Sequence, residues 1–160
     1  MPFSFNYVPI LRSRQQELLV LGTFGFGDRI YPLLEIIKER DRVNNPKPVA
    51  QIWLDHIRQS PAQRIFVDLP TYIRDLASMS NEVVAFNRTM LSNKDRRIEF
   101  FLSLASAADK VIPVVSSLYP KTKELGTIGY QINGLRERFA TIAIRTFGTT
   151  FEQDIDEIEG

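Results

Sequence analysis

The sequence predicts an α/β protein in which strand-helix units repeat and the strands form one parallel sheet. Five short apolar runs recur along the 160 residues, and each leads into polar or charged side chains. The runs are continuous rather than alternating, as in strands covered on both faces, and the segments between them can hold helices. We therefore expect five buried strands, at residues 7–11, 30–34, 65–70, 111–115 and 141–145.

Three of these runs contain a proline after two apolar residues, namely Pro9, Pro32 and Pro113. An internal proline costs a helix about 3 kcal/mol, so the runs are poor candidates for buried helices. Proline also cannot donate to a sheet ladder. We therefore expect each of the three prolines near the beginning of its strand or on an edge.

The segments between the runs have the apolar spacing and the end signals of helices. Ser13 can cap the first helix, and Pro48 can occupy the first turn of the second. The connection between the third and fourth runs is the longest and holds two helical patterns. The predicted helices span residues 13–24, 48–60, 81–91, 94–108 and 122–139, with another beginning in the acidic tail.

Length and composition indicate a single domain covering residues 1–160, with 44% apolar and 24% charged residues. The absence of cysteine excludes disulfides and thiolate zinc sites and suits a reducing compartment. No apolar stretch approaches the roughly 20 residues that cross a bilayer, and the amino terminus lacks a signal-type pattern. We expect a cytoplasmic protein without a membrane partner. A net charge of +1 gives no global attraction to nucleic acid, although local patches leave that partner open.

Two parallel architectures fit this order of elements. One is an open, doubly wound sheet, and the other is a partial TIM-barrel-like sheet with about five of the eight units. A partial barrel would leave two strand edges exposed. In that case we expect a homo-oligomer, or a partner protein that covers the edges.

In both architectures ligands bind at the carboxyl ends of the strands, so the residues just past each run are the candidate site. We select a candidate ligand-binding rim from them: Arg12, Arg14, Glu17, Glu35, Lys38, Asp68 and Arg145. Tyr72, Arg74, Ser116, Ser117 and Thr146 follow the same runs.

The rim has two interpretations. Glu35 and Asp68 could ligate a divalent cation such as Mg²⁺ or Mn²⁺, while arginines neutralise a phosphate. Alternatively, the same residues form structural ion pairs where strands reach solvent. Glu35 and Asp68 lie within or against apolar runs, and a buried carboxylate needs a partner, for which Arg12, Arg14 and Arg145 are candidates.

Other motifs are weaker. His56, the single histidine, lies on a predicted helix away from the strand ends. Gly22, Gly25 and Gly27 follow a helix instead of a strand, so they do not match the dinucleotide-binding fingerprint. The sequence therefore names no catalytic residue.

The opening YVPILRSRQQE and the later YPLLEI resemble the bacteriophage-type beta protein family, found in phages and other mobile elements of bacteria. The residues that carry the resemblance are Tyr7, Pro9, Arg12, Arg14, Glu17, Pro32 and Glu35, with Val67, Asp68 and Leu69 resembling the third strand. Arginines replace the usual lysines. The resemblance implies a barrel-type fold and a phage setting, and it implies no reaction.

Two functions follow. The first is a phage or mobile-element protein that acts by binding a macromolecule or as a subunit of an assembly. The alternative is a metal-assisted phosphoesterase or nuclease-like enzyme that uses Glu35 and Asp68 for the cation and Arg12, Arg14 and Arg145 for phosphate.

Overall fold

A computed structural model describes residues 6–73, 77–149 and 151–159. Its described part contains one five-stranded sheet in which every pairing is parallel, which confirms the predicted fold class. The strands are β1 (Ile10–Arg12), β2 (Leu33–Glu35), β3 (Ile65–Asp68), β4 (Val111–Val115) and β5 (Ala143–Ile144).

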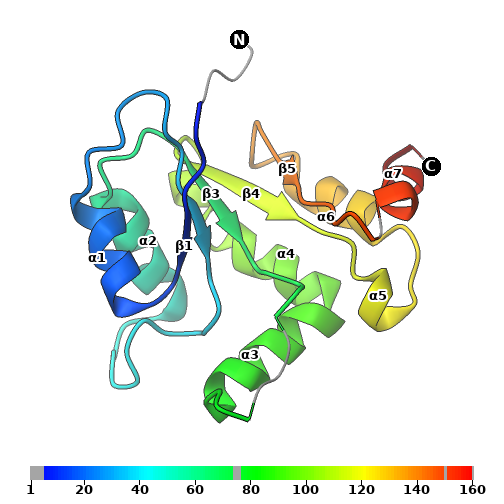
Figure 1. Cartoon of the computed structure of the whole chain (residues 1–160), viewed down its shortest axis with the longest axis horizontal. Coiled ribbons are helices and arrows are strands. Elements are labelled where there is room, and N and C mark those ends of the chain that lie inside the picture. The colour runs from blue at the N-terminus through cyan, green and yellow to red at the C-terminus, as the bar shows by residue number, and fades with distance from the viewer. Residues whose placement is uncertain (1–5, 74–76, 150, 160) are drawn as a thin grey trace.

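The strands lie side by side in the order in which they occur along the chain, β1-β2-β3-β4-β5. A doubly wound sheet reverses its strand order at a switch point, and this sheet does not. The order is that of consecutive barrel units, but the sheet does not close, so β1 and β5 are edge strands. Figure 1 shows β1 with α1 (Gln15–Thr23) at one end of the molecule and β5 with α7 (Phe151–Glu159) at the other.

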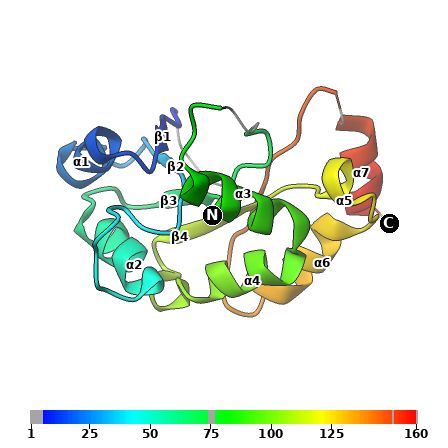
Figure 2. The ribbon, with the colours of Figure 1, turned by 90° about the horizontal axis from the view of Figure 1, so that it is seen from below.

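The helices between the strands cover mainly one face of the sheet. Figure 2 shows α2 (Val49–Gln59), α4 (Lys94–Leu102) and α6 (Thr127–Leu135) along the same side. The main core fills this layer, where Leu34, Val67 and Val115 of the strands pack with helical residues that include Trp53 and Phe101. The layer supplies most of the apolar burial that stabilises the fold.

The opposite face of the sheet carries a second, smaller apolar cluster. Phe66, Ile112 and Val114 are buried there, and partly buried side chains, including Tyr31 and Leu33, pack against them. Because side chains alternate along a strand, residues two apart share a face. Glu35 and Asp68 therefore lie on the same face as this smaller cluster, each two residues after Leu33 and Phe66, respectively.

Two predicted helices are shorter than expected. The pattern over residues 94–108 gives α4, which ends at Leu102, and then a 3₁₀ turn (Ala105–Ala107). The pattern over residues 122–139 gives α6, which begins only at Thr127, after a separate short helix α5 (Tyr119–Thr122). Between the two helices, Lys123 (φ 61°) and Gly126 (φ 73°) adopt left-handed conformations that a helix cannot contain. The two helical patterns between the third and fourth runs are confirmed as α3 (Asn81–Ser92) and α4.

The expected position of the prolines holds for two of the three. Pro9 and Pro32 directly precede β1 and β2, whereas Pro113 is the middle residue of β4. The amide of Arg145 donates to the carbonyl of Val115, so odd-numbered residues of β4 turn their backbone groups toward β5. The pairing with β5 begins only at Val114, so the missing N–H of Pro113 leaves no ladder bond unmade.

The prediction of five buried strands is correct for the centre and wrong for the edges. Every residue of β3 and β4 is buried. By contrast, Ile10 of β1 is 56% exposed, and β5 is reduced to two residues with Ile144 37% exposed. Continuous apolar sequence therefore does not distinguish a central strand from an edge strand here. In the described part of the chain, no helix is long and apolar enough to cross a membrane.

Candidate functional site

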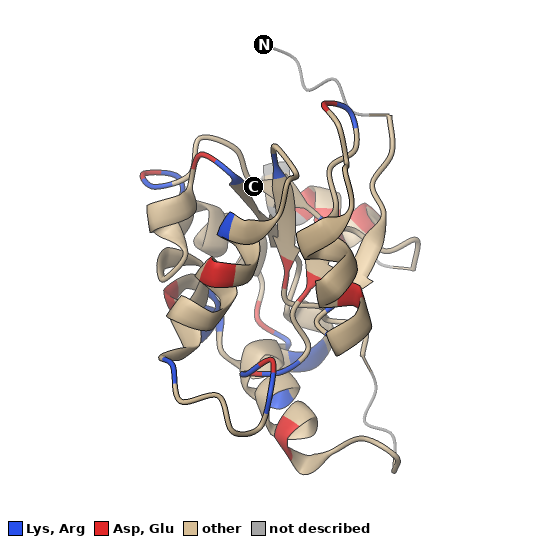
Figure 3. Ribbon diagram, turned by 90° about the vertical axis from the view of Figure 1, so that its left-hand side faces the viewer, with Lys and Arg blue, Asp and Glu red and all other residues tan. Residues whose placement is uncertain are grey.

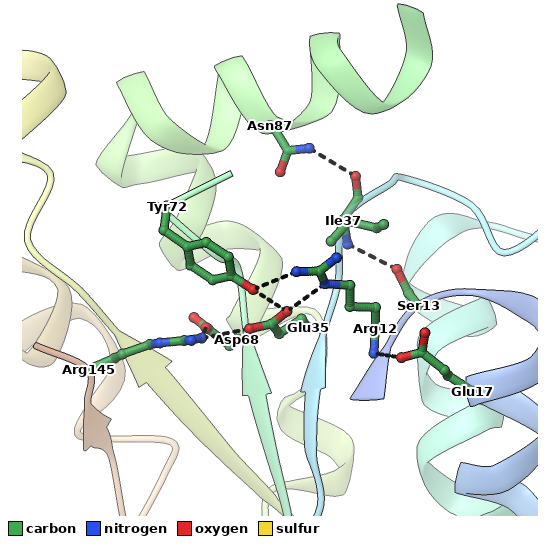
Figure 4. Close-up of polar contacts among 9 residues, drawn as sticks. All are labelled: Arg12, Ser13, Glu17, Glu35, Ile37, Asp68, Tyr72, Asn87 and Arg145. Atoms are coloured by element: carbon green, nitrogen blue, oxygen red, sulfur yellow. Dashed lines mark hydrogen bonds and ion pairs between the residues drawn. The ribbon is translucent and has the colours of Figure 1, made fainter. Parts of the chain in front are cut away.

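Two fully buried carboxylates lie side by side at the carboxyl ends of β2 and β3, and one arginine joins them. The Nη1 group of Arg145 lies 2.8 Å from Oε1 of Glu35 and 2.5 Å from Oδ2 of Asp68. Both carboxylate side chains are 0% exposed, whereas the Arg145 side chain is 22% exposed. The guanidinium therefore compensates two buried charges from the solvent side (Figure 4).

Two further side chains contact the other oxygen of Glu35. The hydroxyl of Tyr72 donates to Oε2 over 2.6 Å, and Nε of Arg12 donates to the same oxygen over 3.3 Å. Nη2 of Arg12 also lies 3.4 Å from the Tyr72 hydroxyl. We call Arg12, Glu35, Asp68, Tyr72 and Arg145 the rim network.

Strand register places the network. Arg12, Glu35 and Asp68 are the last residues of β1, β2 and β3, and they are direct partners in the parallel pairing. Arg145 directly follows β5 and lies two residues beyond Ala143, which is level with Val114 and Asp68. Parallel strands bring their carboxyl ends to one edge, so residues that are far apart in sequence converge here.

Aromatic rings flank the bridging arginine. The guanidinium carbon of Arg145 lies 4.8 Å from the centre of the Tyr72 ring and 5.7 Å from that of Phe147. The two rings contact each other, with 6.2 Å between their centres. Such contacts restrict the orientation of a guanidinium and add a favourable electrostatic interaction.

Burial and neighbouring charges shift the pKa of Asp68 in opposite directions. Its removal from water raises its pKa, and the nearby positive charges of Arg97 and Arg145 only partly offset that effect. Burial and the hydrogen bond to Glu35 likewise raise the pKa of the Tyr72 hydroxyl, which keeps this group protonated as a donor.

A third arginine supports the network from within the protein. Arg97 of α4 is fully buried and donates to the carbonyl of Leu69 (2.9 Å), the carbonyl of Met90 (3.2 Å) and Oε1 of Gln131 (3.0 Å). Burial lowers its pKa to about 10, against the effect of Asp68. Gln131 in turn donates to the carbonyl of Ser116, so this chain of bonds joins the ends of β3 and β4.

Three buried polar atoms around these strand ends have no hydrogen-bond partner among the described residues. They are Oδ1 of Asp68, Nη2 of Arg97 and Oγ of Ser116. Orphan buried groups are costly, and they are uncommon in proteins unless water or a ligand binds them. The strand ends thus retain unused donors and acceptors.

A cavity of about 300 Å³ opens beside the rim network. It is formed by segments that follow β3, β4 and β5, and by α7. Tyr72 and Phe147 supply aromatic walls, while Ser117, Lys121 and Asp154 are among its polar residues. Tyr72 belongs to both the cavity and the network, so a molecule bound in the cavity would contact the network directly.

The remaining predicted rim residues lie outside the network. Glu17 accepts a hydrogen bond from the backbone amide of Arg12, and Lys38 donates to the carbonyl of Asp41 over 2.7 Å. Arg14 is exposed at the start of α1. Arg74 lies outside the described residues. Four of the seven rim residues therefore converge, and their role stays a prediction.

Ser13 does not cap α1 as expected. Its buried hydroxyl instead accepts a hydrogen bond from the amide of Ile37 (2.9 Å), and Asn87 donates to the carbonyl of the same residue (3.2 Å). These two side chains fix the backbone that leaves β2. Sequence reasoning did not identify Asn87, Arg97 or Gln131, because polar residues on amphipathic helices give no signal of burial.

An arginine already occupies the position at which Glu35 and Asp68 were expected to ligate a metal ion. Arg145 lies between Glu35 and Asp68, where a cation bound to both would have to displace it. Among the described residues, no group of three or more His, Asp and Glu side chains could hold a metal ion. Mg²⁺ or Mn²⁺ binding stays a prediction that a titration can test.

His56 belongs to a different part of the molecule. Its Nε2 atom lies 3.0 Å from Oδ2 of Asp41, beside a larger cavity of about 540 Å³ between α1 and α2. Hydrogen bonds from Asn45 and His56 outweigh the effect of burial and lower the pKa of Asp41. The pair lies on the helical layer, as the sequence suggested, and not at the strand ends.

Comparison with known proteins identifies a family. A family model described as Beta protein matches residues 7–159, well beyond the amino-terminal segment in which the resemblance is visible by eye. No curated protein and no solved structure matches the chain. The match includes all five strands and every residue of the rim network. The chain therefore belongs to the beta protein family.

Proposed function

We propose that the chain acts as a protein-binding subunit of a phage or mobile-element assembly, and that the first partner of each copy is a second copy. The observation that carries the proposal is the exposure of apolar side chains at both open ends of the sheet. Family membership supports the setting. The sheet itself supports the mode of action, because its order leaves β1 and β5 without neighbours.

The first surface is the α1 end, which we define by Val20 and Phe24 with Arg14 and Arg29. Val20 is 41% exposed and Phe24 is 50% exposed. Glu17, on the same helical face, contacts β1, so this face points along the open edge rather than toward α2. Both arginines are exposed, and Figure 3 looks onto this end of the molecule.

The second surface is the α7 end, defined by Phe151, Glu152, Asp156 and Ile158. Phe151 is 51% exposed and Ile158 is 39% exposed. Glu152 and Asp156 are exposed as well, and the sequence of α7 contains acidic residues and no basic residue. Apolar groups thus occur at both ends, with basic neighbours at one and acidic neighbours at the other.

The two ends complement each other in position as well as in charge. In a parallel sheet whose strands lie in sequence order, each helix packs beside the next one. The α1 helix of a second copy can therefore pack beside α7 as a following helix would. Opposite charges then favour this head-to-tail contact over α1 with α1 or α7 with α7. A head-to-tail contact closes into a ring when its rotation allows.

Backbone groups at the open edge of β1 already have hydrogen-bond partners, which indicates that helices dominate the contact between the two copies. Glu17 accepts from the amide of Arg12, and the amide of Arg14 donates to the carbonyl of Arg12 over 2.7 Å. These bonds occupy backbone groups that a pairing strand would need. We therefore expect the partner to bind through α1 and α7, with little added strand pairing.

Light scattering coupled to size exclusion tests the proposal. Wild-type protein should show at least about twice the 18.4 kDa of one chain, with a mass that falls on dilution. Val20→Glu should give a monomer, because it adds a charge to the apolar surface that faces the acidic α7. The matched control is Val43→Glu, at a side chain that is 81% exposed in the loop after β2. A wild-type monomer at every concentration would contradict the proposal.

A second candidate function is metal-assisted processing of a phosphoester. It is favoured by the two adjacent buried carboxylates and by the unpartnered Oδ1 of Asp68. If it holds, millimolar Mg²⁺ or Mn²⁺ should raise the melting temperature of wild type but not of Asp68→Asn. Calorimetry that detects no cation binding would remove this candidate and leave the assembly proposal intact.

A further inference from the structure

The charged groups at the strand ends do not balance. Glu35 and Asp68 contribute two carboxylates, whereas Arg12, Arg145 and Arg97 contribute three guanidinium groups. The hydrogen-bond partners of Arg97 are carbonyl and amide oxygens, which carry no net charge. With its pKa lowered to about 10, Arg97 still carries its charge at neutral pH. The rim network and Arg97 together therefore carry one positive charge in excess.

The positive groups of the rim network, and not its carboxylates, face solvent. The Arg12 side chain is 40% exposed and that of Arg145 is 22% exposed, while both carboxylates are 0% exposed. All side-chain hydrogen bonds of Arg145 to described residues run from Nη1, which leaves Nε and Nη2 as donors. A solute that reaches the rim network meets guanidinium groups before it meets carboxylates. Such a surface attracts anions.

The adjoining cavity adds a place for an apolar group. Tyr72 and Phe147 line it together with Leu118 and Pro120. Its volume of about 300 Å³ lies at the lower end of the range for ligand pockets, so it suits a compact molecule with one ring system. Lys121 and Asp154 also line the cavity and contribute one charge of each sign, which leaves the excess unchanged.

Charge and shape point to one class of ligand. We infer that the cavity and the rim network together bind a small organic anion, with a planar apolar group between Tyr72 and Leu118 and a phosphate or carboxylate at Arg12 and Arg145. The aromatic rings that contact Arg145 also line the cavity, so the two halves of the site are adjacent. The inference requires no metal and no reaction.

Isothermal calorimetry with the full chain tests the inference, with phenyl phosphate as the combined probe. Inorganic phosphate serves as the anion alone, phenol as the ring alone, and benzoate as the carboxylate alternative. Phenyl phosphate or benzoate should bind at least about tenfold more tightly than inorganic phosphate or phenol. The better of the two anions identifies the acidic group.

Two variants separate the halves of the site. Arg12→Gln should weaken phenyl phosphate and inorganic phosphate about tenfold each, whereas Phe147→Leu should weaken phenyl phosphate alone. Arg12 is partly exposed, and Glu35 keeps Tyr72 and Arg145 as partners without it, so the fold should survive. Near-UV circular dichroism checks this. Arg58→Gln is the charge-matched control, because Arg58 is exposed in the last turn of α2 and belongs neither to the rim network nor to the α1 and α7 ends.

Three results would overturn the inference. They are an absence of saturable binding up to about 10 mM probe, equal weakening by Arg12→Gln and Arg58→Gln, and equal affinity for phenol and phenyl phosphate. The titrations are repeated on Val20→Glu. Anion binding that persists in a monomeric variant shows that the site is independent of assembly, so failure of either proposal is recognisable on its own.

Discussion

Two isoleucines in one row of the sheet mark the difference between its centre and its ends. Ile10 in β1 and Ile112 in β4 are linked through the paired residues Leu33 and Phe66, yet Ile10 is 56% exposed and Ile112 is 0% exposed. The same residue type at the same level thus serves different purposes. The centre stabilises the fold, and the ends expose apolar surface, to which we propose that a second copy binds.

A first contrast with a large expected effect is the cost of shortening each of the two isoleucines. Ile112→Ala should lower the free energy of unfolding by about 2–5 kcal/mol, because it leaves a cavity in a packed face. Ile10→Ala should cost about 1 kcal/mol or less in the monomer, where most of its side chain is already hydrated. Urea unfolding at a concentration that keeps the chain monomeric measures both values. Equal costs would mean that β1 is as well covered as β4, contrary to the exposures.

Ion pairs offer a second contrast between a buried site and an exposed one. Arg145→Met should destabilise by about 3–5 kcal/mol, since it leaves two buried carboxylates without their bridging partner. Arg96→Met removes a pair with Glu99 in which both side chains are more than 60% exposed (63% and 61%), so its cost should be about 1 kcal/mol or less. Chemical denaturation at pH 7 compares the two. A cost below about 1 kcal/mol for Arg145→Met would show that another group compensates the carboxylates.

The smallest effect concerns how two aspartates respond to pH. Burial raises the pKa of Asp68, so its contribution to stability is present below the ordinary aspartate value and declines as pH rises through the raised one. The lowered pKa of Asp41 gives the reverse, with a contribution present above the ordinary value and lost as pH falls. Relative to wild type, Asp68→Asn should therefore gain stability between about pH 4 and pH 7.

As pH rises from about 2 to about 5, Asp41→Asn should lose stability relative to wild type, because the lowered pKa of Asp41 acts in that range. Unfolding free energies measured in urea at several pH values give the two slopes. Slopes of the same sign would mean that Arg97 and Arg145 outweigh the burial of Asp68. That result would mean that attraction to the arginines, and not removal from water, has the larger influence on the pKa of Asp68.

The sequence predicted the fold class and the convergence of four rim residues because both depend on the ends of apolar runs, while the role of those residues stays a prediction. Continuous runs indicate parallel strands, and parallel strands bring Arg12, Glu35, Asp68 and Arg145 to one edge. No knowledge of the helices is needed for that step. The family match over residues 7–159 agrees with the resemblance seen in the opening segment.

Sequence patterns could not separate features that depend on neighbours in space. Edge and central strands have the same composition, so the exposure of Ile10 was not foreseen. Arg97 occurs in a charged stretch typical of a solvated helix, yet it is buried because the carbonyls of Leu69 and Met90 lie within reach. The interruption at Lys123 depends on a left-handed backbone that its side chain does not signal.

The central claim is that the two ends of the sheet bind each other, and a mixing experiment tests it most directly. Val20→Glu disables the α1 end, and Phe151→Lys disables the α7 end by adding a positive charge that faces Arg14 and Arg29 of the α1 end. Light scattering should find each variant monomeric alone and a 1:1 mixture dimeric, because one head-to-tail contact remains intact in the mixture. A mixture that stays monomeric, while wild type forms dimers, would contradict head-to-tail binding. A variant that still forms dimers on its own would show that like ends pair instead.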